Sequence, residues 1–138
     1  MQPLDIPRFD PVISGTGQDE LYEDGRVFGA VETFEGEHGK SLTIYEWFSD
    51  FRNQGHTIEA LKWLRAQGFS EICARRVGTL EEVDGTLIGD IATCYWAHLV
   101  NKGLVDRIFD DDHCEIAVAP DDSVSLKASP PYLKASAP

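Results

Sequence analysis

The chain of 138 residues is long enough for one domain with a hydrophobic core and too short for two. Its hydrophobic content of 42% is typical of a globular protein, and no apolar run approaches the length of a membrane span. The formal net charge of -12 repels nucleic-acid phosphates and attracts cationic partners, although such a charge also keeps a protein in solution. We therefore expect neither a membrane nor a nucleic-acid partner.

Cysteine usage and the N-terminal residues indicate the compartment. Cys73, Cys94 and Cys114 are an odd number of cysteines without C-x-x-C spacing, which favours reduced thiols and argues against a zinc site. The N-terminus shows no basic segment followed by an apolar run, as a signal peptide would. These features predict a cytoplasmic protein without a metal site.

The first half of the chain predicts an irregular lead-in followed by two strands. Residues 1–26 contain three prolines before position 12 and few apolar residues after it. Residues 27–34 are rich in β-formers and predict a strand. A loop with two glycines at 35–40 is suited to a hairpin, and it leads to a second strand at 41–48.

A helix and a third strand follow. Apolar residues recur at helical spacing over 57–67, and Gly68 stands where a C-terminal cap belongs. Residues 69–74 predict a short buried strand, so strand, helix and strand imply a parallel crossover. Residues 75–89 predict a long loop, which in a small domain is usually functional or mobile.

The last part of the chain predicts a helix and a hairpin. Asp90 can cap a helix over 91–102, and strands are expected at 104–109 and 114–119. The acidic turn between them lacks the longer alternating pattern of a calcium loop, so we interpret its carboxylates as solvated. Residues 120–138 predict a flexible tail. The fold class is therefore α/β in the broad sense (α+β), with one mixed sheet flanked by helices.

The central feature of the sequence is the polar turn between strand 41–48 and the helix that begins near Thr57. Gly55 lets the backbone approach a ligand closely, because no Cβ stands in the way. A helix start also directs unpaired backbone N–H groups and the positive end of the helix dipole at the same point. The turn therefore predicts a phosphate or pyrophosphate site, and an ordinary strand-to-helix connection is the alternative.

The same turn resembles the coenzyme A-binding segment of the GNAT superfamily of N-acetyltransferases. The family motif reads Arg/Gln-x-x-Gly-x-Gly/Ala, and here Thr57 occupies the last position with a bulkier, β-branched side chain. The resemblance implies acetyl-CoA as the cofactor. It also implies that coenzyme A is bound by the residues at and before the helix start, which are Trp47, Phe48, Arg52, Asn53, Gln54, Gly55, His56 and Thr57.

The resemblance extends over residues 27–119, the GNAT-like domain, whose predicted order is strand, strand, helix, strand, helix, strand, strand. An Ala-x-x-Tyr-Trp run at 92–96, followed by Gly103, is similar to a later family motif, although this helix carries one extra turn. Family members usually have two helices between their first two strands. Residues 1–26 show no pattern long enough for them, so the acceptor side is expected to be abbreviated.

Acetyl transfer to an amine requires a base for the amine and an acid for the leaving thiolate. Glu46 occupies the position of a family base, and we expect it to share a buried face with Leu42, Ile44 and Phe48; a glutamate at a solvated edge is the alternative. By resemblance, Tyr95 is the candidate acid, with a core tyrosine as the alternative. Tyr45 is a reserve candidate.

Three functional hypotheses follow. The first is an acetyl-CoA-dependent N-acetyltransferase that acts by direct attack on an amine of a small molecule or protein, a cationic one given the charge. The second is a non-catalytic protein of the same fold that holds a protein partner through its acidic surface. The third is a homodimer in which a second chain completes the acceptor side.

Overall fold

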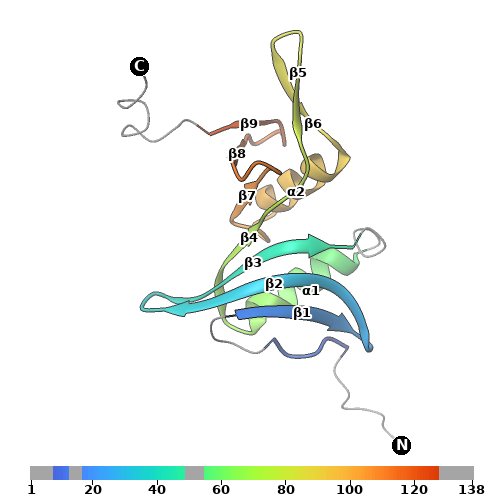
Figure 1. Ribbon diagram of the computed structural model, residues 1–138, viewed down its shortest axis with the longest axis vertical. Coiled ribbons are helices and arrows are strands. Elements are labelled where there is room, and N and C mark those ends of the chain that lie inside the picture. The colour runs from blue at the N-terminus through green and yellow to red at the C-terminus, as the bar shows by residue number, and fades with distance from the viewer. Residues whose placement is uncertain (1–7, 13–16, 49–54, 128–138) are drawn as a thin grey trace, which may run out of the picture.

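The computed structural model describes residues 8–12, 17–48 and 55–127. The main element of the fold is a mixed sheet (Figure 1). Its seven strands lie in the order β1-β2-β3-β4-β7-β8-β9. The first three pair antiparallel, β3 with β4 and β4 with β7 pair parallel, and the last three pair antiparallel. The strands are β1 (Gly17–Glu23), β2 (Arg26–Gly36), β3 (Gly39–Trp47), β4 (Phe69–Ala74), β7 (Arg107–Phe109), β8 (Glu115–Val118) and β9 (Val124–Leu126).

Helix α1 (His56–Ala66) makes the crossover between β3 and β4, and it lies behind β2 and β3 in Figure 1. Its residues Ala60, Leu61 and Leu64 are completely buried in the core that they share with the inner face of the sheet. Each fully buried leucine contributes about 1.5–3 kcal/mol relative to an exposed one. The predicted helix and the parallel pairing after it are confirmed.

Helix α2 (Ile91–Asn101) begins at Asp90, as the sequence predicts. The Asp90 carboxylate accepts a hydrogen bond from the backbone N–H of Thr93 at 2.8 Å, which satisfies one of the unpaired donors of the first turn. Trp96, Ala97 and Leu99 bury the inner side of α2 in the core. Among the described residues, neither helix is long and apolar enough to cross a membrane.

Three segments that were expected to lack regular structure form strands. They contain too few apolar residues for the sequence pattern to predict these strands. The lead-in contains β1, which is joined to β2 by the tight turn at Asp24 and Gly25 and buries only Leu21 completely. The loop over 75–89 contains the hairpin of β5 (Leu80–Val83) and β6 (Thr86–Gly89), which projects from the domain in Figure 1. The expected tail contains β9, which buries Val124, and the residues from 128 lie outside the described part.

Candidate functional site

The end of β3 and the start of α1 are joined by a buried hydrogen bond. The indole Nε1–H of Trp47 donates to Oγ1 of Thr57 at 3.0 Å, and both side chains lie in the core. Phe28 packs edge-on against Trp47, with ring centroids 5.1 Å apart. The β-branched residue at the last motif position is therefore part of the packing that fixes both ends of the turn.

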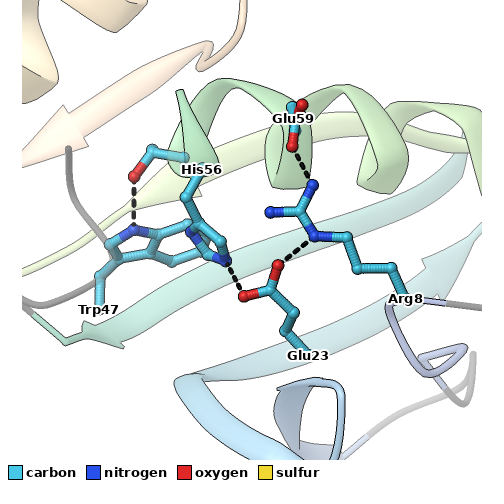
Figure 2. A network of polar contacts seen from close by, with 6 residues as sticks. Arg8, Glu23, Trp47, His56 and Glu59 are labelled. Atoms are coloured by element: carbon cyan, nitrogen blue, oxygen red, sulfur yellow. Dashed lines mark hydrogen bonds and ion pairs between the residues drawn. The ribbon is translucent and has the colours of Figure 1, made fainter. Parts of the chain in front are cut away.

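A polar network ties the N-terminal segment and β1 to the same helix start (Figure 2). The imidazole Nε2 of His56 lies 3.1 Å from Oε1 of Glu23, and both side chains are largely buried. The guanidinium of Arg8 contacts the carboxylates of Glu23 and Glu59. His56 thus contributes its side chain to the support of α1, of which it is the first residue.

Gly55 immediately precedes α1 and has a left-handed backbone, with a φ of 78°. Its carbonyl oxygen accepts the first helical hydrogen bond from the N–H of Glu59 at 3.0 Å. A Cβ built at Gly55 meets no described atom within 4 Å, so the position faces open space. These properties fit a backbone that a ligand approaches closely. The motif residues Arg52, Asn53 and Gln54 lie outside the described residues.

A β-bulge at the end of β3 overturns the expected orientation of Glu46. Val31 pairs with Ile44 and Ala30 with Glu46, so β3 carries one extra residue, Tyr45, between them. The extra residue shifts the alternation, which buries Ile44 and Trp47 and leaves Glu46 exposed.

The bulge depends on a glycine opposite its end. A Cβ at Gly29 would lie 2.8 Å from the carbonyl oxygen of Glu46 and 3.3 Å from the Trp47 ring. Only glycine therefore allows β2 to approach β3 this closely.

A surface hollow of about 600 Å³ opens over β1, β2 and the bulge of β3. Phe48, which follows β3, is 41% exposed but does not belong to its lining. The lining combines acidic, basic and aromatic side chains from four segments, namely Gln18, Asp19, Glu20, Ala30, Val31, Tyr45, Glu46 and Arg76.

The described part of the lining contains three carboxylates, and two of them have partners. Oδ2 of Asp19 accepts a hydrogen bond from the hydroxyl of Thr33 at 3.2 Å, and Oε1 of Glu20 accepts one from the hydroxyl of Tyr22 at 3.1 Å. Within the described part of the chain, the carboxylate of Glu46 has no hydrogen bond or ion pair. Glu46 is therefore the carboxylate available to a ligand.

Tyr45 lies between charges of both signs. Burial, followed by the charge of Glu32, raises the pKa of its hydroxyl above the ordinary value, while the guanidiniums of Arg75 and Arg76 act in the opposite direction. Both arginines thus act electrostatically on Tyr45, and Arg76 also lines the hollow.

Helix α2 reaches the end of β3 through Trp96, whose ring centroid lies 5.7 Å from that of Trp47. Tyr95 is half-buried, packs against the core and lies edge-on to Trp96 at 6.3 Å. It does not belong to the lining of the hollow, so the structure brings Glu46 and Tyr45 together and places Tyr95 outside the hollow, on α2.

The sequence reasoning missed the residues of β1 and Arg76 as parts of a site. Strand β1 carries too few apolar residues to be recognised, so its acidic side chains had no predicted position. Arg76 could have been predicted as a site residue, because it follows the carboxyl end of a parallel strand, where ligands commonly bind in open α/β sheets.

No family model matches the chain, and neither a curated protein nor a solved structure matches it. The described residues contain no group of three or more His, Cys, Asp or Glu side chains arranged to hold a metal ion. The fold itself defines the class of the protein as an α+β domain with a mixed sheet. Its function has to be inferred from the turn and the hollow.

Proposed function

We propose that the protein is an acetyl-CoA-dependent N-acetyltransferase that acts on an amine by direct attack. The observation that carries the proposal is the position of Glu46, an unpaired carboxylate in the hollow at the end of β3. The same strand leads into the turn that ends at Gly55. Base and turn are thus held at one end of a single strand, which is the arrangement that the family resemblance implies.

The described part of the turn fits the cofactor that the resemblance implies. Gly55 combines a left-handed backbone with open space, and α1 begins directly after it. When bound, acetyl-CoA would supply the acetyl group as a thioester. Phe48 and the backbone from Gly55 onward are the described motif residues available to hold it, while Trp47 and Thr57 fix the shape of the turn.

Each residue of the site has a distinct role in this proposal. Glu46 accepts a proton from the amine, whose nitrogen forms the new N–C bond as the thioester C–S bond breaks. By resemblance, Tyr95 donates the proton that the leaving thiolate takes up, and Tyr45, which lines the hollow, is the reserve candidate. Asp19 and Glu20 add negative potential that attracts a protonated amine into the hollow.

The test is thiol release from acetyl-CoA in the presence of a panel of amines, with the parent protein and Glu46→Gln. We expect the variant to lose about 10²–10⁴-fold in turnover and to keep its affinity for coenzyme A, because the substitution removes only the proton acceptor. The control is Glu35→Gln, an exposed residue of β2 outside the hollow. Equal turnover in parent and Glu46→Gln would remove Glu46 from the mechanism.

One observation favours the non-catalytic alternative. Strands β1 and β2 are joined directly at Asp24 and Gly25, so no helix from this connection encloses the hollow. An open acidic surface of this kind suits a protein partner, and a second copy of the chain would also cover it. Coenzyme A binding without thiol release for any amine would support this alternative.

A further inference from the structure

We propose that the acceptor is a small amine that also carries a carboxylate, such as an amino acid. This inference rests on the proposed function and names the substrate class of the same hollow. It follows from two charged residues of the described lining that have no partner, the anionic Glu46 and the cationic Arg76.

Among the described residues, Arg76 is the only cationic one in the lining of the hollow. Like Glu46, it has no ion pair or hydrogen bond to its side chain within the described part of the chain. Glu46 and Arg76 thus face one cavity without pairing to each other. A ligand with an ammonium group and an anionic group would satisfy both residues at once.

The backbone at Arg76 is fixed by its neighbours. Its φ of 59° lies in the left-handed region, which residues other than glycine rarely adopt and which is often found at binding sites. The neighbours on both sides are fixed, because Arg75 N–H donates to the carbonyl of Ile44 at 2.8 Å and Val77 N–H to that of Phe109 at 3.1 Å. The strained residue therefore sits between two hydrogen-bonded ones.

The chemistry of the guanidinium selects the anionic group. Its planar fork matches the two oxygens of a carboxylate, whereas a simple alkylamine would leave Arg76 unpaired and be repelled by it. The volume of about 600 Å³ suits a small molecule. In the transfer, Glu46 takes the proton, the N–C bond forms as the C–S bond breaks, the thiolate is protonated, and the carboxylate remains unchanged.

The test compares ω-amino acids of increasing chain length with n-alkylamines of the same length. Turnover is followed by thiol release, and binding of the amines alone is followed by calorimetry. With the parent we expect a preference of about 10- to 100-fold in kcat/KM for the best amino acid over its alkylamine, as one charge-assisted hydrogen-bonded pair provides.

Arg76→Gln should abolish this preference, and Arg76→Lys should keep part of it because the charge remains without the fork. The matched control is Lys62→Gln, which removes one exposed positive charge on α1 and should leave the preference intact. Thermal melting checks that all three variants are folded.

The outcomes separate the inference from the proposed function. If amines are acetylated without preference for the amino acids, or if Arg76→Gln keeps the preference, the inference is wrong and the acetyltransferase stands. If amino acids bind in an Arg76-dependent way and none is acetylated, the hollow binds this class of molecule as a ligand and the proposed activity is wrong. If no amino acid is either bound or acetylated, the inference is wrong.

Discussion

A substitution at Gly55 separates the structural role of the turn from its binding role. Gly55 has a φ of 78°, and Gly103 at the end of α2 has a φ of 77°; a Cβ at either position meets no described atom within 4 Å. Gly→Ala should therefore cost the same at both, since the strain of the left-handed backbone is the only penalty, about 1–2 kcal/mol. For a chain of this size, each kcal/mol lowers Tm by about 4 °C.

Coenzyme A binding should distinguish the two variants. Gly55→Ala places a methyl group where the ligand must approach the backbone, so we expect its Kd to rise by at least about tenfold. Gly103→Ala should bind as the parent does. Urea unfolding gives the stabilities and calorimetry gives the two Kd values. A Gly55→Ala protein with the expected loss of stability and unchanged Kd would show that the turn is only a connection.

Two further predictions concern stability and thiol reactivity. Hydrogen bonds from Arg107 and then Lys127 lower the pKa of Glu115 to about 2, so this carboxylate stabilises the fold above its unfolded-state pKa, and the effect is lost as pH falls from about 4.5 to 2. Glu115→Gln should cost about 1 kcal/mol at pH 7, allowing for the exposed partners, and only a small part of that at pH 2; equal costs in urea unfolding at both pH values would contradict this. Burial, followed by Glu71, raises the pKa of the Cys73 thiol to about 12, whereas the other two cysteines are exposed. A disulfide reagent should therefore modify two thiols rapidly in the folded protein, and rapid modification of Cys73 would contradict the buried position.

Elements with a strong apolar period could be predicted from the sequence. Helix α1 shows its buried residues at helical spacing, and Asp90 marks the start of α2 by the chemistry of its side chain. The parallel pairing of β3 and β4 follows from the helix between them. In these places local pattern and tertiary packing favour the same structure.

The parts that could not be predicted depend on contacts distant in the sequence. The alternation along β3 places Glu46 with Ile44, but the bulge reverses it, and the bulge requires the close approach of Gly29 on the neighbouring strand. Strand β1 forms because β2 supplies its hydrogen bonds, not because its own residues are apolar. The hollow combines both features, so its lining could not be derived from the motif alone.

The most direct test of the central claim is an acetyl-CoA titration of the parent protein followed by the backbone amide resonances. We predict saturable shifts that are largest from Gly55 to Ile58 and from Tyr45 to Phe48, at the start of α1 and the bulge of β3. We expect small shifts in the β5–β6 hairpin, which lies outside the site. Absence of shifts at millimolar acetyl-CoA, or shifts centred on other elements, would contradict the proposed coenzyme site.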